Sequence, residues 1–265
     1  MRLLSCLLLF SATQVLADSS AFRFDASRVP VGQVFHYVKS NLDGSHEGQI
    51  SVYMLDQSQV ESLKWDPGAQ SATLVTAAMD WTRFSVRRFE AYQLSSGSPP
   101  KLRATLEASP DGSQLRASFK EAPVQISHWP WHSYDFDFTS LNLTIPHWRN
   151  TRGTMTFWRT DYIYSEPADF REVGAIELKY ERTEEHRGQR ANRYSIGGQG
   201  LDAQYGTWWS DANSGLLIEY ELPIADEPGY ENVRLRLRAS ERMSPSQWDE
   251  FKRAAVNGKP ASDAH

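Results

Sequence analysis

The sequence predicts a mainly β protein, in which a long antiparallel meander of strands curls into a half-barrel or barrel and one short helix lies near the C-terminus. Apolar and polar residues alternate in many short segments, as in strands that bury one face. Turn-forming residues recur about every ten residues, a spacing typical of a meander. Only one segment carries the boundary signals of a helix. A β-sandwich is the alternative architecture.

Residues 101–120 form the clearest predicted hairpin. Leu102, Ala104 and Leu106 alternate with charged or polar neighbours, which places the three apolar side chains on one face. The chain then turns through residues 109–112 (Ser-Pro-Asp-Gly), where proline sets φ and glycine accepts a positive φ. The same alternation follows the turn, so two neighbouring strands are expected.

Two further strands are expected to pair near the C-terminus. The apolar set of the first strand is Leu216, Ile218, Tyr220 and Leu222. The charged residues that would face each other across the pair are Glu219, Glu221, Arg234, Arg236 and Arg238. Opposite charges at this spacing add about 0.2–1 kcal/mol per pair and help to fix register. The main interpretation is therefore a solvated ladder of ion pairs, and the alternative is an anion-binding patch.

A change of apolar phase near Arg87 and Arg88 interrupts another strand. Phe84 and Val86 lie on one face, and Phe89 falls on the other. One extra residue in a strand produces such a change, so a β-bulge is expected here.

The predicted helix begins after Ser244, which is a good N-cap residue. Pro245 suits the first helical position and Gln247 completes a capping box with Ser244. Gly258 can end the helix.

The first 17 residues have the pattern of a cleavable secretory signal. Arg2 supplies a positive start, residues 3–10 are mostly apolar, and Ala17 ends a cleavage site. The apolar run is shorter than the ~20 residues that span a bilayer. We therefore expect a periplasmic protein, or alternatively a secreted one, whose mature chain has no transmembrane segment. The lone cysteine, Cys6, would be lost with the signal.

The expected organisation is a signal peptide over 1–17, one all-β domain over 18–258 and a disordered tail over 259–265. The formal net charge is −5, and removal of Arg2 with the signal makes it −6. An acidic chain has no general attraction for nucleic acid or for anionic membranes. The mature chain without cysteine excludes disulfides and thiol chemistry.

Strands with one apolar face constrain the architecture. A sheet of such strands cannot stay flat in water, so it must curl, stack on itself or be covered. A curled sheet leaves a concave apolar interior, which is the usual form of a site for a lipid or small molecule. A sandwich fills its own interior and needs no ligand.

Two hairpin patterns resemble known families. Residues 35–38 (Phe-His-Tyr-Val) with 43–45 (Asp-Gly-Ser) resemble the first hairpin of an uncharacterised family of bacterial exported proteins. The closing pattern, residues 206–211 (Gly-Thr-Trp-Trp-Ser-Asp) and 214–218 (Ser-Gly-Leu-Leu-Ile), is similar to that of periplasmic lipoprotein carriers of the LolA/LolB type. This resemblance implies an unclosed antiparallel half-barrel with an apolar cavity.

Residues 128–138 form the most unusual stretch, with two His, two Asp and five aromatic residues. Three interpretations are a metal site, an aromatic platform for a sugar or lipid, and a crossover segment whose aromatic rings belong to the core. Pro130 blocks the helix that would bring His128 and His132 together, so no metal is expected. Asp135 and Asp137 would share a face of an extended segment, as in a glycoside hydrolase. The candidate ligand-binding residues are Trp129, Trp131, His132, Tyr134, Trp148, Trp208 and Trp209.

The sequence favours a non-enzymatic protein that binds an apolar or amphipathic ligand, or a cell-envelope partner, on the concave face. The alternatives are a glycan-binding or glycan-cleaving protein and an assembly factor without a ligand. Motifs of serine hydrolases, zinc proteases, phosphate-binding loops and dinucleotide sites are missing from the sequence, and no cofactor is expected.

Overall fold

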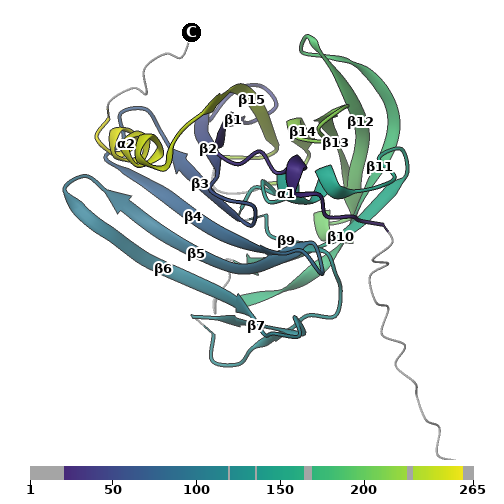
Figure 1. Ribbon diagram of the computed structural model, residues 1–265, viewed down its shortest axis with the longest axis horizontal. Helices are drawn as coiled ribbons and strands as arrows, with labels where there is room; N and C mark the ends of the chain where they lie inside the picture. The colour runs from purple at the N-terminus through teal and green to yellow at the C-terminus, as the bar shows by residue number, and fades with distance from the viewer. Residues whose placement is uncertain (1–20, 119, 135, 164–168, 226–228, 259–265) are drawn as a thin grey trace, which may run out of the picture.

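The structure of the protein is a computed structural model that describes residues 21–118, 120–134, 136–163, 169–225 and 229–258. The predicted signal peptide and C-terminal tail lie outside these residues. Fifteen strands of the described chain form one sheet. The predicted mainly β fold, with one large curved antiparallel sheet that does not close, is confirmed, and the sandwich alternative is wrong (Figure 1).

In chain order, the strands are β1 (Gln33–Ser40), β2 (Gly48–Met54), β3 (Gln59–Trp65), β4 (Ser71–Asp80), β5 (Ser85–Ser95), β6 (Ser98–Ala108), β7 (Gln114–Ala117), β8 (Val124–Gln125), β9 (Trp131–His132), β10 (Thr154–Ile163), β11 (Asp169–His186), β12 (Gln189–Gly198), β13 (Gln204–Asp211), β14 (Leu217–Leu222) and β15 (Val233–Arg242). The helices are α1 (Leu141–Thr144) and α2 (Pro245–Val256), with short 3₁₀ helices η1 (Ala26–Arg28), η2 (Ile145–His147) and η3 (Gln199–Leu201).

The sheet consists of two meanders joined in its middle. The spatial order runs from β8 back to β1, then from β15 back to β9. The join is the antiparallel pair of β1 and β15, so the first and last strands of the chain lie side by side. The predicted neighbours β14 and β15 do pair, with Glu221 opposite Arg234. Only β9, at one edge, runs parallel to its neighbour β10 among the described strands.

Curvature brings the two ends of the sheet towards each other. Lys120, just after β7, forms an ion pair with Asp169 at the start of β11. The carboxylate of Glu172 in β11 accepts hydrogen bonds from the backbone N–H groups of Ser127 (2.9 Å) and His128 (3.2 Å), in the segment that follows β8. These contacts hold the sheet as an incomplete barrel.

The interior of this barrel is occupied by residues 131–134 and 136–148, hereafter the plug. It contains β9, α1 and η2, and Figure 1 shows α1 and β9 between the wall of β3 to β6 and the wall of β10 to β12. Every residue of the plug is buried. Its apolar members join the concave side chains of the sheet in one large core. The third interpretation of the aromatic stretch, a crossover segment packed in the core, matches this arrangement.

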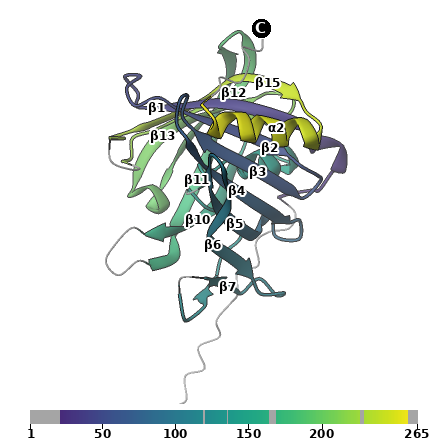
Figure 2. The same ribbon diagram turned by 90° about the vertical axis from the view of Figure 1, so that its left-hand side faces the viewer.

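The convex face of β1 to β5 is covered by α2 (Figure 2). Ser244 and Gln247 form the predicted capping box, and Pro245 is the first helical residue. Trp248 stacks on Tyr53 of β2, with ring centroids 5.2 Å apart. Because α2 covers one face and the plug the other, residues 50–54 of β2 are all buried. This part of β2 therefore has no face exposed to water.

Bulges change which side chains face the interior, and three of them bear on the strands predicted from the sequence. The bulge predicted near Arg87 is confirmed, because Ala78 pairs with Arg88 and Met79 with Val86. A second bulge at Arg103 was not predicted: Ala91 pairs with Ala104, but Tyr92 pairs with Leu102. Leu102 therefore leaves the face of Ala104 and Leu106 and is 49% exposed, which corrects the predicted alternation.

The third bulge lies in β14. Trp209 pairs with Glu219, and Ser210 with Leu217, which leaves Ile218 as the extra residue. Leu217 thus joins the interior core, and Ile218 packs with Trp209 on the convex side. The predicted apolar set of this strand is wrong at Ile218 for this reason.

No helix of the described residues is both long and apolar enough to cross a membrane.

Candidate functional site

A hollow of about 450 Å³ lies between the plug and the concave face of β4 to β6. Val75 of β4, Phe89 and Ala91 of β5, and Leu106 of β6 line one side. Trp131 of the plug, with Tyr162 of β10 and Phe170 of β11, lines the other. Its remaining lining residues are Lys64, Thr73, Tyr92, Gln93, Arg103, Ala104, Thr105 and Ser133. This volume lies within the range of about 300–1,000 Å³ that is usual for small-molecule pockets.

Small side chains leave this space open. Ala91 and Ala104 are directly opposite each other in the ladder of β5 and β6, so two methyl groups stand where larger residues would fill the interior. Ala91 is also paired with Val75 of β4. Alternation along these strands directs all three side chains into the barrel. The floor of the hollow is therefore apolar.

Hydrogen bonds fix the plug wall of the hollow. Ser85 Oγ accepts from the backbone N–H of Trp131 at 2.9 Å. The carboxylate of Asp161 in β10 accepts from Ser133 Oγ at 2.7 Å and from the backbone N–H of Tyr134 at 3.1 Å. Asp161 also lies 2.8 Å from Nε of Arg159. Buried backbone groups cost free energy when unpaired, so these contacts fix where Trp131 stands.

An ion-pair cluster ties the plug to the other wall. Asp137, which is 1% exposed, lies 3.1 Å from Nζ of Lys39 in β1 and 2.7 Å from Nζ of Lys64 in β3. Burial alone would raise the pKa of Asp137, but the two ammonium groups outweigh it and hold that pKa below its ordinary value. Lys64 also lines the hollow, so the cluster connects the anchor of the plug to the candidate site.

Of the seven residues predicted to bind a ligand, all described, only Trp131 lines the hollow. His132, Tyr134, Trp148 and Trp208 are buried in the core. Trp129 is half-buried beneath the guanidinium of Arg83, which lies 5.6 Å from the ring centroid. Trp208 and Trp209 point to opposite faces of β13, as expected of adjacent strand residues, and Trp209 stacks on His186 of the convex side. The seven residues do not converge on one site.

Sequence reasoning missed most of the wall of the hollow. Val75, Phe89, Phe170, Lys64 and Arg103 come from five strands, and no motif connects them. The alternation of Ala104 and Leu106 was a partial signal, because it identified one apolar face.

His132 has a structural environment. It is fully buried, and its Nδ1 lies 2.8 Å from Oγ of Ser140 within the plug. Burial lowers the pKa of His132 to about 3, against a weaker opposite effect of the Phe84 backbone. The imidazole is therefore neutral at physiological pH and belongs to the polar packing of the plug.

The metal and hydrolase interpretations find no geometric support. No group of three or more His, Cys, Asp or Glu residues among those the structure describes could hold a metal ion. Asp137 has a φ of 49° and lies in a turn, so the extended segment assumed for a carboxylate pair is not formed there. His128 stacks on Trp158, with ring centroids 3.5 Å apart, and pairs with Glu172.

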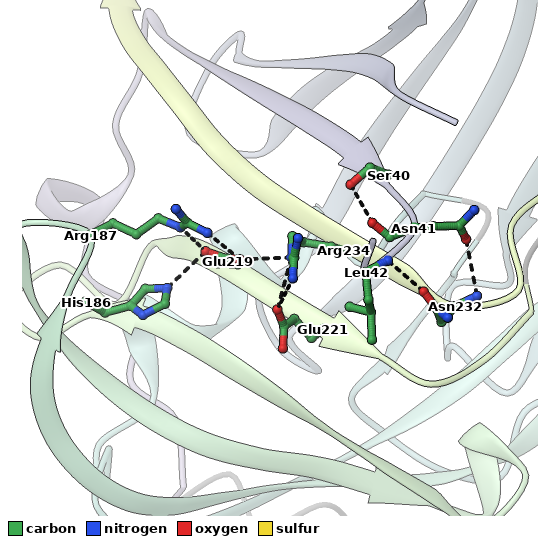
Figure 3. A network of polar contacts seen from close by, with 9 residues as sticks. All are labelled: Ser40, Asn41, Leu42, His186, Arg187, Glu219, Glu221, Asn232 and Arg234. Atoms are coloured by element: carbon green, nitrogen blue, oxygen red, sulfur yellow. Dashed lines mark hydrogen bonds and ion pairs between the residues drawn. The ribbon is translucent and has the colours of Figure 1, made fainter. Parts of the chain in front are cut away.

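A second polar network crosses the convex face at β14 and β15 (Figure 3). Glu219 accepts from Nε2 of His186 at 3.0 Å, pairs with Arg187, and lies 3.3 Å from Nε of Arg234. Glu221 lies 2.7 Å from Arg234. The predicted pairing of glutamates with arginines is present, but Glu219 is 1% exposed, so this part of the ladder is buried rather than solvated.

No family model matches the sequence. No curated protein matches it either. Among solved structures, a β-barrel-like protein of the domain of unknown function DUF1849 from Brucella abortus is similar with a TM-score of 0.45 and 8% identity, over 81% of this chain and 98% of that one. A domain described as an outer membrane lipoprotein-sorting protein from Vibrio parahaemolyticus has a TM-score of 0.25 and 8% identity, over 87% and 94% of the two chains. Likeness at this level carries no information about function.

Replacing Asp137 should destabilise the fold. We expect Asp137→Ala to lower the free energy of unfolding by about 3–5 kcal/mol, because it breaks the ion pairs of this buried carboxylate with Lys39 and Lys64. Urea unfolding followed by fluorescence measures this change. The control is Asp249→Ala. The side chain of Asp249 is 61% exposed in its pair with Lys252, so its removal should change the free energy of unfolding by less than about 0.5 kcal/mol. Equal losses in the two variants would contradict an anchoring role for Asp137.

The neutral His132 predicts a pH dependence of stability. The folded pKa is about 3. The unfolded chain takes up a proton below about pH 6.5, whereas the folded chain does not until far lower pH, so stability is lost as pH falls through that window. The difference in free energy of unfolding between the wild type and His132→Gln should change by about 2 kcal/mol between pH 7 and pH 5, to the disadvantage of the wild type at the lower pH. Urea unfolding of both proteins at each pH measures it, and a constant difference would refute the assignment.

Proposed function

We propose that this protein is a non-enzymatic binder of an apolar or amphipathic ligand, which it holds in the hollow between the plug and β4 to β6. The single observation that supports this proposal most is the hollow itself. A filled interior would place large side chains at Ala91 and Ala104, and instead about 450 Å³ remains between Val75, Leu106 and Trp131. An apolar space of this kind favours occupants that gain from leaving water.

The apolar lining and the polar anchoring have separate roles. Hydrogen bonds from Trp131 to Ser85 and from Ser133 to Asp161 fix the wall without any contribution from a ligand. A preformed wall lowers the entropy cost of binding. The site therefore fits a ligand that enters an existing space rather than one that orders the chain.

Glycan binding is less well supported by the same geometry. A sugar platform requires exposed aromatic faces, whereas Trp131, Tyr134, Phe136 and Phe138 are buried. We retain apolar-ligand binding as the proposal.

We further infer that the protein works in the periplasm after cleavage of residues 1–17. The charged start, the short apolar run and Ala17 support this inference. N-terminal sequencing of the exported protein should begin at Asp18, and an intact Met1 would contradict it.

Filling the hollow should weaken ligand binding. The test titrates the mature protein with N-phenyl-1-naphthylamine, a neutral apolar dye whose fluorescence rises in dry sites. We expect Ala91→Trp to weaken dye binding at least about tenfold, which corresponds to about 1.4 kcal/mol, because the new indole occupies the space of the ligand.

The matched control is Leu102→Trp, which adds an indole to the convex face of the neighbouring strand. This variant should bind the dye like the wild type. Thermal melts of both variants exclude unfolding as the cause. Unchanged dye binding by Ala91→Trp, or no binding by the wild type, would refute the proposal.

A further inference from the structure

The outer edge of β6 is open along residues 98–104. Within the described chain, β7 pairs with β6 only at residues 106–108, and the carbonyl of Thr105 accepts from the backbone N–H of Ser118 at 3.0 Å. In Figure 1, β7 accordingly lies beside only the C-terminal end of β6. No described backbone group pairs with the outer edge of residues 98–104. The N–H and C=O groups on that edge are therefore available to another chain.

This edge is exposed and already in the conformation that pairing requires. Residues 98–103 are all exposed. On its inner side β6 pairs with β5 from Ser98 to Glu107, so the strand is held extended before any partner arrives. The strands that end the sheet, β8 and β9, have two residues each and offer little edge of their own.

Two cations give the concave side of this edge a positive charge. Lys101 is directly opposite Gln93, which lines the hollow. Arg103 is the extra residue before Ala104 and also lines the hollow. Both cations are exposed, and neither forms an ion pair within the described residues. A neighbouring strand is stabilised when it places acidic side chains beside such cations.

The convex side of the same edge is apolar. Leu102 is 49% exposed and pairs with Tyr92, which packs against the cluster that contains α2. Pro100, Leu94 and Val256 help to line a second hollow of about 560 Å³, between α2 and the strands β4 to β6. A strand added at the edge of β6 would therefore meet cations on one face and apolar side chains on the other.

A second copy of this chain fits the edge poorly. Two β6 edges paired antiparallel would bring Lys101 and Arg103 of one copy close to the same cations of the other, and like charges across a strand pair are destabilising. Pro99 and Pro100 have no backbone N–H to donate, which further discourages self-association. The same charges that disfavour a second copy favour an acidic partner.

We propose that the open edge of β6 binds an extended segment of a partner protein in which acidic and apolar residues alternate. The segment adds a strand to the sheet through backbone hydrogen bonds. Its acidic side chains lie beside Lys101 and Arg103, and its apolar side chains lie beside Leu102. This interaction goes beyond the proposed function and does not depend on it, because the segment pairs with the backbone of β6 whatever the hollow holds.

The test measures binding of a fluorescein-labelled peptide to the mature protein by fluorescence anisotropy at neutral pH. The peptide has about nine residues, within the usual length of a strand, and alternates valine with glutamate. A second peptide has lysine in place of every glutamate. We expect the glutamate peptide to bind at least about tenfold more tightly, because the contacts with Lys101 and Arg103 change from attraction to repulsion in the lysine peptide.

The decisive variant is Lys101→Glu/Arg103→Glu, which reverses the charge of the edge. It should reverse the preference, so that the lysine peptide binds about tenfold more tightly than the glutamate peptide. The control is Lys179→Glu/Arg238→Glu, which makes the same change of net charge at exposed residues of the inner strands β11 and β15 and should keep the wild-type preference. All four positions are exposed, so thermal melts of both variants should match that of the wild type.

Pairing through the backbone is tested separately from charge. Alternate residues of an extended peptide direct their N–H groups to opposite edges. Methylation of one alternate set of peptide nitrogens should therefore abolish binding, and methylation of the other set should leave it unchanged, because only one edge of the peptide faces β6. Amide hydrogen exchange in residues 101–104 should also slow when the glutamate peptide is bound.

Equal binding of the two peptides by the wild type, or an unreversed preference in Lys101→Glu/Arg103→Glu, would overturn the proposal. Equal effects of the two methylated sets would also overturn it, since charge alone would then hold the peptide. Binding of neither peptide would refute strand addition and leave the proposed function standing, because the dye titration of the hollow does not use the edge of β6.

Discussion

Keeping water from the concave face of the sheet is the constraint on which the rest of the structure depends. Nearly every strand contributes an inward apolar set, and a flat sheet would leave that surface wet. Curvature removes part of it, and the plug covers most of what remains, with every residue of it buried. Because most of the plug is irregular chain rather than a second sheet, its backbone N–H groups need hydrogen-bond acceptors from other parts of the molecule. Ser85 and Asp161 supply them on the two sides of the interior.

The same constraint explains why charge lies inside the molecule. Asp137 enters the core with a left-handed backbone conformation and meets two lysines that project inward from β1 and β3. An unpaired carboxylate at that depth would cost several kcal/mol, so the lysines are required where the plug turns. Lys64 of this cluster also lines the hollow beside β4 to β6. Anchoring of the plug and the electrostatics of the hollow are thus properties of one cluster.

The comparison of sequence and structure is most informative at the bulges. The bulge near Arg87 was predicted from the sequence because Phe84 and Val86 before it and Phe89 after it visibly change phase. Arg103 and Ile218 were not found, because the residues beside them keep an apparent alternation across the extra position. Pairing with the neighbouring strand fixes the phase there, and pairing is a long-range property. The missed bulge at Arg103 is also the one that brings a cation to the candidate site.

The sequence by itself determined the mainly β class, the capped C-terminal helix, the pairing of β14 with β15 and the opposed directions of Trp208 and Trp209. Each follows from local periodicity, from turn and cap chemistry or from charge along a strand. Only the tertiary structure decided that residues 131–134 and 136–148 fold into the barrel, that Ala91 faces Ala104, and that Lys64 and Arg103 share one hollow. These facts depend on which strands become neighbours and on where the plug finds hydrogen-bond partners for its backbone. No local sequence pattern encodes either of these.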